Sequence, residues 1–143
     1  MASTDKTDII LLSIHPQYAE AILEGKKKVE FRKKNIPRHI RHVLLYATSP
    51  VRRVVGYFSV AEVIETSPEE AWKRFNGTGG IEHKAFAAYY ANTGISVVMV
   101  IEASQRFRRP IKLESVDTEA RAPQSYRYVD TKIFKKLMRR VYQ

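Results

Sequence analysis

The sequence contains no cysteine, and this absence removes several classes of site at once. Without thiols there is no disulfide framework, no cysteine-ligated zinc and no thiol nucleophile. The four histidines are scattered with no spacing suited to a metal site, so we expect neither a metal nor a cofactor. The glycine-rich stretch at residues 76–80 lacks the Lys-Ser/Thr pair of a phosphate-binding P-loop, which argues against nucleoside triphosphate binding there.

Long hydrophobic runs are missing as well. No apolar run approaches the ~20 residues of a membrane span, and residues 1–8 are polar and lack the apolar region of a signal peptide. We therefore expect a cytoplasmic protein with no membrane partner. With 143 residues and 44% hydrophobic composition, the chain is expected to form one domain over residues 1–143, with residues 1–7 as a disordered tail.

Acidic residues are scarce relative to basic ones. The chain has 25 Lys and Arg against 15 Asp and Glu, a formal net charge of +10, and such a field attracts polyanions. The cations concentrate between Lys26 and Arg53 and again after Lys132, whereas Glu62 and Glu65 lie elsewhere. This clustering favours a nucleic-acid footprint over a uniform basic coat.

The hydrophobic pattern predicts strands interleaved with a few short helices. Apolar, β-branched runs predict strands at residues 9–14, 43–48, 54–64 and 97–101, with a last strand at 106–113 broken by Pro110. Helices are expected after Pro16, after Pro68, across residues 81–91 and after Asp130. Residues 123–128 are interpreted as a polar loop with aromatic side chains. This order is compatible with a parallel layered sheet or with a small barrel carrying helices.

One acid stands alone in the basic segment near the N-terminus. Glu30 is the single carboxylate among ten Lys and Arg in residues 26–53. With Lys28 and Arg32 it forms either an exposed ladder of ion pairs, worth little energy, or the centre of a cleft that binds a ligand. In a strand these three side chains share one face, and the apolar residues between them point to the other. Lys27 reaches the same face only if a bulge or a strand start separates it from Glu30, which we expect.

The spacing of these residues resembles the G-x-K-x-x-E-x-R signature of the ASCH domain, a branch of the PUA-like superfamily. The positions that match are Gly25, Lys27, Glu30 and Arg32. Residues 12–18, 46–50 and 123–128, together with Gly56, also resemble a subgroup of small, stand-alone prokaryotic ASCH proteins. This resemblance covers nearly the whole chain and implies an α+β fold, a PUA-like β-barrel of mixed, mostly antiparallel strands with flanking helices.

The resemblance also implies two classes of function. ASCH domains are associated with RNA, and PUA-like domains bind RNA or modified bases. One ASCH branch removes acetyl groups from N4-acetylcytidine with a Lys, a Thr nucleophile and a Glu, and another member is described as a ribonuclease. Here Glu30 occupies the position of that threonine, so the hydroxyl nucleophile is absent. We therefore expect binding of RNA or of a modified nucleobase or nucleotide, with a metal-independent hydrolase acting on RNA or a modified nucleoside as the alternative.

Candidate site residues follow from the chemistry of base and phosphate recognition. Arginine offers a planar fork to a phosphate or a base edge, a carboxylate accepts from base N–H groups, and tyrosine rings stack on bases. The expected binding residues are His15, Lys27, Lys28, Glu30, Arg32, Tyr46, Thr48, Ser49, Gln124, Ser125 and Tyr126, although Tyr46 fits a buried core position better than a stacking platform. If the protein is an enzyme, Lys27, Glu30 and Arg32 are the expected catalytic residues. We expect single-stranded RNA, or a nucleotide or modified nucleobase, as the partner, and rank duplex DNA below it because no helix-turn-helix spacing is present.

Overall fold

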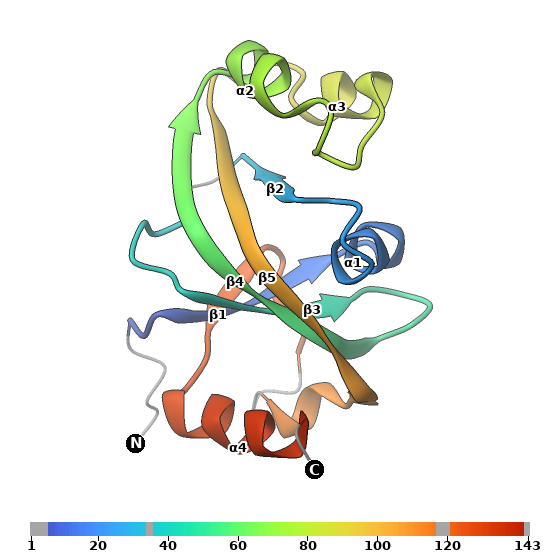
Figure 1. Cartoon of the computed structure of the whole chain (residues 1–143), viewed down its shortest axis with the longest axis vertical. Coiled ribbons are helices and arrows are strands. Elements are labelled where there is room, and N and C mark those ends of the chain that lie inside the picture. The colour runs from blue at the N-terminus through green and yellow to red at the C-terminus, as the bar shows by residue number, and fades with distance from the viewer. Residues whose placement is uncertain (1–5, 34–35, 117–120, 142–143) are drawn as a thin grey trace.

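The computed structural model describes residues 6–33, 36–116 and 121–141, which contain six strands and four α-helices (Figure 1). The strands are β1 (Ile9–Ile14), β2 (Val29–Arg32), β3 (His42–Ala47), β4 (Arg53–Thr66), β5 (Ser96–Ile111) and β6 (Tyr126–Tyr128). The helices are α1 (Pro16–Leu23), α2 (Pro68–Phe75), α3 (His83–Tyr89) and α4 (Thr131–Val141). Of the tail expected at residues 1–7, residues 1–5 lie outside the described residues, and the Thr7 hydroxyl donates to the Val129 carbonyl at 2.8 Å.

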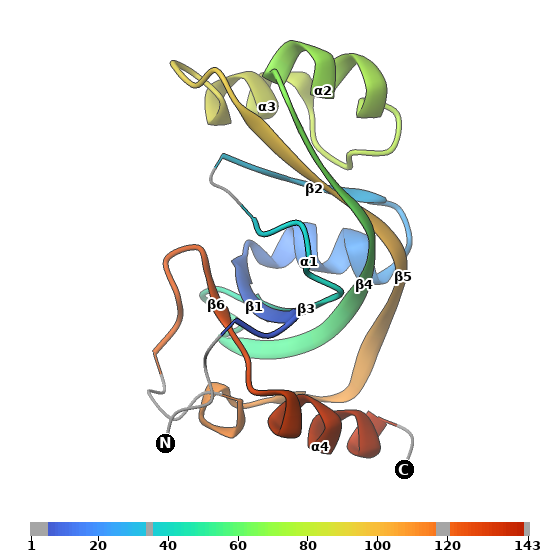
Figure 2. The ribbon, with the colours of Figure 1, turned by 90° about the vertical axis from the view of Figure 1, so that its left-hand side faces the viewer.

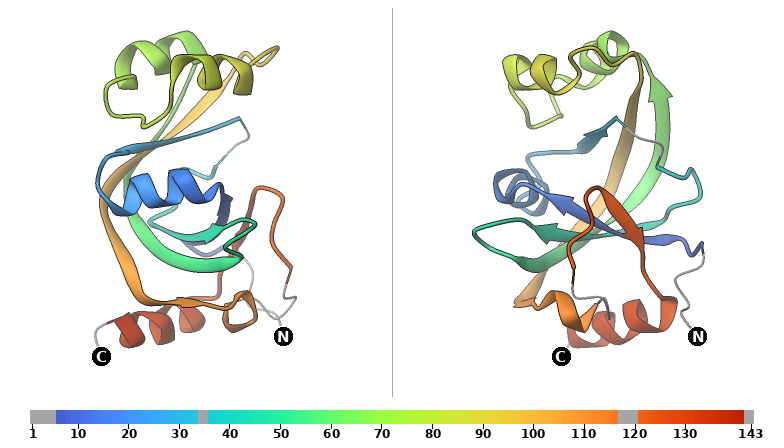
Figure 3. Two further views of the ribbon diagram at one scale, coloured as in Figure 1. Left: turned by 90° about the vertical axis from the view of Figure 1, so that its right-hand side faces the viewer. Right: turned by 180° about the vertical axis from the view of Figure 1, so that it is seen from behind.

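The six described strands form one mixed sheet in the order β2-β5-β4-β3-β1-β6. β1 and β3 run parallel, and the other neighbouring pairs are antiparallel. The sheet curls into a half-barrel with α1 packed against β3, β4 and β5 (Figure 2). α2 and α3 lie at one end of the long axis and α4 at the other (Figure 3). This arrangement confirms the predicted α+β, PUA-like architecture and excludes the parallel layered sheet.

β5 is one continuous strand of 16 residues, so the prediction of two strands at 97–101 and 106–113 was wrong. Pro110 does not break it, because it lies in an irregular stretch: Val54 pairs with Ile111 and Gly56 already pairs with Arg106. A proline in such a bulge removes no regular ladder hydrogen bond. At Gly56, an added Cβ would lie 2.5 Å from the Gln105 carbonyl, so this bend in β4 has no room for a side chain.

Residues 126–128 form β6, so their interpretation as part of a loop was also wrong. β6 pairs antiparallel with β1, with Tyr128 opposite Ile10 and Tyr126 opposite Leu12. Three residues are too few for an alternating pattern to stand out in the sequence, and the partner strand is more than a hundred residues away in the chain. None of the described helices has the length and apolar character that a membrane crossing requires.

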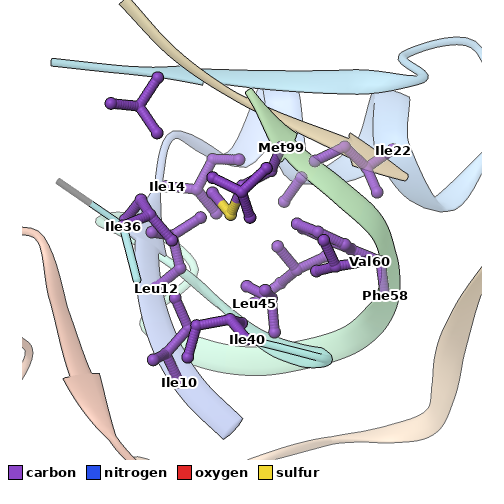
Figure 4. Close-up of a cluster of buried hydrophobic side chains, with 14 of the residues drawn as sticks. Ile10, Leu12, Ile14, Ile22, Ile36, Ile40, Leu45, Phe58, Val60 and Met99 are labelled. Atoms are coloured by element: carbon purple, nitrogen blue, oxygen red, sulfur yellow. The ribbon is translucent and has the colours of Figure 1, made fainter. Parts of the chain in front are cut away.

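Both faces of the sheet are buried at β1, which explains its continuous apolar run. Ile10 and Leu12 point into the half-barrel, where the side chains of β3, β4 and β5 meet them (Figure 4). Ile9 and Leu11 lie on the opposite face, in a second cluster that Phe134 of α4 joins. A strand buried on both sides loses the polar alternation that a half-exposed strand shows.

The apolar residues of β2 fix the direction of its polar ones. Val29 and Phe31 are buried in a third cluster under α2 and α3, and the ring of Phe31 meets that of Phe86 edge-on at 4.9 Å. Because strand side chains alternate, Glu30 points to the other face. The alternation predicted for Val29, Glu30, Phe31 and Arg32 is confirmed, and it places the carboxylate on the face of β2 opposite the third cluster. Lys28 precedes the strand and does not share the cavity with Glu30, so the prediction was wrong for this residue.

Candidate functional site

A cavity of about 660 Å³ lies where several elements converge on the polar face of β2. Its walls come from the end of β1, the start of α1, the β3–β4 turn, α3 and the segment before β6. Lys27, Glu30 and Arg32 line it together, with His15 and Thr48 also in its wall. The volume falls in the range of roughly 300–1,000 Å³ typical of small-molecule pockets.

Lys27 reaches the cavity because the strand has not yet begun there. α1 ends at Leu23, Gly25 adopts a left-handed φ of +80°, and the Lys27 N–H still donates to the Ala21 carbonyl at 3.0 Å. β2 starts two residues later, at Val29. The irregularity expected between Lys27 and Glu30 is therefore a strand start, and the two side chains share one face.

The Lys27 ammonium is enclosed by the protein. Its side chain is 2% exposed, it lies 3.5 Å from Glu30 Oε1, and it donates a short hydrogen bond to the Gly79 carbonyl. The rings of Tyr18 and Phe31 lie 5.3 and 5.2 Å from Nζ. Burial lowers the pKa of Lys27 from its ordinary value of 10.5, and the Glu30 carboxylate opposes this shift by favouring the charged form.

Arg32 joins parts of the chain that are distant in sequence. Its Nη1 donates to Glu30 Oε2 at 3.2 Å and to the Ser13 carbonyl of β1 at 3.4 Å, while Nη2 donates to Ser125 Oγ at 3.3 Å. β2 is one edge of the sheet and Ser125 directly precedes β6, the other edge. The guanidinium thus bridges the two edges of the half-barrel. The fork that we expected to be free for a ligand is largely occupied by the chain itself.

The glycine-rich stretch of residues 76–80 has a role that sequence reasoning missed. At Gly80, with a φ of +63°, an added Cβ would lie 2.7 Å from Lys27 Cβ, and at Gly79 it would lie 2.6 Å from the ring of Phe31. The Thr78 carbonyl accepts from the Lys28 N–H at 2.7 Å. The stretch therefore packs directly on the motif, and two adjacent glycines after a helix end were the signal for this close approach.

The remaining candidate residues divide into two groups. His15, Thr48 and Gln124 line the cavity. Ser125 does not, but its hydroxyl accepts a hydrogen bond from Arg32, which does. Tyr46, Lys28, Ser49 and Tyr126 are not in its wall: Tyr46 is 7% exposed and packed in the second core cluster, Lys28 and Ser49 point to solvent, and Tyr126 packs on the main core. A ring as buried as that of Tyr46 has no face for stacking on a base, so we leave it out of the proposed site.

Two other tyrosines line the cavity in its place. Tyr18 of α1 and Tyr89 of α3 are both in the wall, and Ile81 before α3 and Ala85 within it complete an apolar side. Tyr18 belongs to the segment that resembles the ASCH family, and Tyr89 lies with Phe86 and Tyr90 near the end of the helix expected across residues 81–91. Both signals were present in the sequence, but neither showed that the rings face the same space as Glu30.

The hydroxyl of the buried Tyr90 fixes the position of the Arg32 backbone by a hydrogen bond. Tyr90 donates to the Arg32 carbonyl at 2.8 Å and accepts from Ser96 Oγ at 2.7 Å. Burial raises the pKa of the Tyr90 phenol well above its ordinary value near 10. The folded state therefore keeps this proton at a pH where the unfolded chain loses it.

Replacing Tyr90 by phenylalanine is expected to lower the free energy of unfolding by about 1–2 kcal/mol at neutral pH, because the Arg32 carbonyl and Ser96 lose their partner. The raised pKa gives stability that is fully present below pH 10 and is lost as pH rises through the folded-state pKa. Stability should thus decline less steeply above pH 10 in Tyr90→Phe than in the wild type. Urea titrations across this pH range measure it, and equal slopes would contradict the shift.

The family model of the ASCH domain matches residues 12–125, most of the chain and all of the elements that wall the cavity. The chain belongs to the ASCH domain family. An ASCH domain-containing ribonuclease of Zymomonas mobilis is 28% identical over 107 residues, which cover 74% of this chain and 72% of that protein.

Two further similarities concern the extent and the shape of this ASCH domain. The crystal structure of ASCH from Zymomonas mobilis superposes with a TM-score of 0.84 at 25% identity, over 92% of this chain and 94% of that one. Large ribosomal subunit protein uL22 of Ureaplasma parvum is 25% identical over 126 residues, and the chain spans only 40% of that relative's length. Within residues 6–33, 36–116 and 121–141, no group of three His, Asp or Glu is placed to hold a metal ion.

Proposed function

We propose that this ASCH domain binds RNA, taking one nucleobase of a single strand, or a free modified nucleobase or nucleotide, into the cavity around Glu30. The proposal is carried by one observation: a carboxylate is held in the wall of an open cavity, 7% exposed, between Lys27 and Arg32. A buried charge is retained only where cations or hydrogen bonds compensate it. The chain belongs to the ASCH family, whose members are associated with RNA, and its net charge of +10 favours the same partner.

The chemistry of the walls suits a flat heterocycle. A carboxylate has about four lone-pair sites, and the contacts to Lys27 and Arg32 leave acceptor capacity for the N–H groups of a base. Tyr18 and Tyr89 offer rings for stacking. Thr48 and Gln124 supply hydrogen-bonding groups at the rim that distinguish one base edge from another.

The test compares Glu30→Gln with Glu24→Gln, the same carboxylate-to-amide change on an exposed side chain of the same segment. Losing the charged acceptor should weaken binding of short single-stranded RNA about 10–100-fold, the value of one hydrogen bond to a charged group. Glu24→Gln should stay within about twofold of the wild type, since exposed ion pairs contribute little. Fluorescence anisotropy with four homopolymeric oligonucleotides measures the affinity and the base preference.

Two additional variants separate a binding defect from a folding defect. Thr48→Val and Gln124→Ala change the rim of the cavity and leave the buried charges intact. Both should change the preference among the four oligonucleotides while the circular dichroism spectrum stays that of the wild type. If Glu30→Gln and both rim variants bind every oligonucleotide like the wild type, the cavity is not the RNA site.

A metal-independent hydrolase is the second candidate, because the Zymomonas mobilis relative is named a ribonuclease. In this chain Lys27 and Arg32 would stabilise charge developing on a phosphate, and Glu30 or His15 would move protons. The same variants decide this: turnover of RNA, or of an N4-acylated cytidine, should appear in the wild type and be lost in Glu30→Gln. Binding without any product in the wild type rejects the enzyme and leaves the binding module.

A further inference from the structure

We infer that the end of the molecule formed by α4, the end of β5 and the β3–β4 turn binds the phosphate backbone of the RNA strand whose base occupies the cavity. This surface, the basic end, is defined by Arg52, Arg53, Arg109, Lys112, Lys132, Lys135, Lys136 and Arg139. The inference rests on the proposed function, since it extends the same ligand beyond the cavity. The basic end would contact several successive phosphates of that strand.

Charge is distributed unevenly along the long axis of the molecule. Figure 1 places α4 at one end and α2 with α3 at the other. The distal half of β4, with α2 and α3, carries Glu62, Glu65, Glu69, Glu70 and Glu82. Glu114 and Asp130 are acids within this end, and Asp8 and Glu102 act on His42, whose ring lies 4.8 Å from that of Phe134 of α4. Asp130 is engaged at the start of α4, where its Oδ1 accepts from the Lys132 N–H at 2.7 Å.

The helix α4 presents its cations because its apolar side is used for packing. Phe134 and Leu137 are buried in the second core cluster with Ile111 of β5. Lys135 and Lys136 lie on the exposed side, with the other cations of α4 within one turn on either side. The exposed side of α4 thus carries a row of cations with no acid between them in the sequence of the helix, and such a row attracts the phosphates of a polyanion.

The basic end is continuous with the rim of the cavity. Thr48 lines the cavity and also begins the β3–β4 turn, where its carbonyl accepts from the Val51 and Arg52 N–H groups at 3.1 and 3.4 Å. Arg53 then opens β4, and the next residue pairs with Ile111, which Lys112 follows. A strand leaving the cavity over Thr48 therefore meets cations on the turn first, then those at the end of β5, and finally α4.

An exposed basic surface could also be simply solvated, and ion pairing separates the two cases. Within the described residues, the ion pairs join Glu24 to Lys26, Glu30 to Lys27 and Arg32, and Glu20 to Arg106. None of these carboxylates neutralises the turn or α4. Within the part of the chain that the structure describes, the cations of the basic end therefore repel one another with no ion pair to a carboxylate, and a bound polyanion would relieve that repulsion.

The test neutralises two cations at each end of the molecule. Lys135→Gln with Lys136→Gln changes the basic end, and Lys73→Gln with Arg74→Gln removes the same charge from adjacent exposed positions of α2. For a long single-stranded RNA, the first pair should reduce the slope of log affinity against log salt by about 1.4, since each phosphate contact on a single strand contributes about 0.7. The affinity in 0.1 M salt should fall about 25-fold by the same relation. The α2 pair should leave both quantities near those of the wild type.

The length of the ligand separates this inference from the proposed function. A mononucleotide that fills only the cavity should bind the α4 variant as it binds the wild type, and should lose affinity in Glu30→Gln. If the long RNA binds the α4 variant and the α2 variant equally, the basic end is ordinary solvated surface and the inference is wrong. If long RNA binding depends on α4 but not on Glu30, the basic end stands and the cavity proposal is wrong. Equal dependence on α4 for duplex DNA would overturn the assignment to single-stranded RNA.

Discussion

Replacing Glu30 by alanine is expected to lower the free energy of unfolding by about 3–5 kcal/mol, the usual result of removing one partner of a buried ion pair. Lys27 Nζ and Arg32 Nη1 lie 3.5 and 3.2 Å from its carboxylate, and the Lys27 side chain is 2% exposed. Without Glu30, a buried ammonium keeps its desolvation penalty and loses its counter-charge. Urea titration followed by circular dichroism measures the change, with linear extrapolation to water.

A double mutant separates the buried charge from the general effect of mutation. Lys27→Met combined with Glu30→Ala should destabilise less than the sum of the two single changes, because the double mutant has no buried ammonium without a counter-charge. Glu24→Ala is the matched control: its partner Lys26 is 3.4 Å away and the pair is exposed, so the expected loss is at most about 1 kcal/mol. Additive effects in the double mutant, with Glu30→Ala no worse than Glu24→Ala, would show that the three groups do not act as a buried unit.

Replacing Gly80 by alanine is expected to disturb both stability and ligand binding. The new Cβ would lie 2.7 Å from Lys27 Cβ, and the φ of +63° is strained for any L-residue. Overpacking and a strained backbone each cost about 1–3 kcal/mol. The contact also pushes on the lysine that flanks Glu30, so the affinity for short single-stranded RNA should fall together with the free energy of unfolding.

Gly77→Ala in the same stretch provides the control. A Cβ at Gly77 meets nothing within 4 Å. We expect the unfolding free energy to change by no more than about 0.5 kcal/mol, as for an ordinary surface substitution. RNA affinity should stay at the wild-type value. Similar losses in Gly77→Ala and Gly80→Ala would mean that the stretch acts through its general flexibility and not through its contact with Lys27.

Much of the site was predictable because its signals are local. Gly25 ends α1 in a left-handed turn, and the alternation of β2 buries Val29 and Phe31, which aims Glu30 the other way. The strand start that brings Lys27 beside Glu30 follows from the same short segment. Each of these features depends on residues only a few positions apart, where periodicity and turn chemistry are reliable guides.

Other features depend on partners that are distant in the chain. Arg32 looked like a free ligand-binding fork, yet it bonds to Ser13 and Ser125, and only the curl of the sheet brings these together. Tyr46 and Tyr89 are both aromatic residues at the ends of their elements, but the first is packed in the core and the second lines the cavity. Neither the type of a residue nor its place in its element shows whether its side chain is free for a ligand or packed against the chain.

The order and faces of the main elements, the family, and the isolation of one acid among many cations could all be read from the amino-acid sequence. These depend on composition and on repeats of two or 3.6 residues, which act over short distances along the chain. The folded chain was needed to show that β5 continues through Pro110, that residues 126–128 pair with β1, and that Lys27, Glu30 and Arg32 line one cavity with Tyr18 and Tyr89. Pairing between distant strands depends on how the whole sheet curls to bury its core, and that curl is a property of all the strands together.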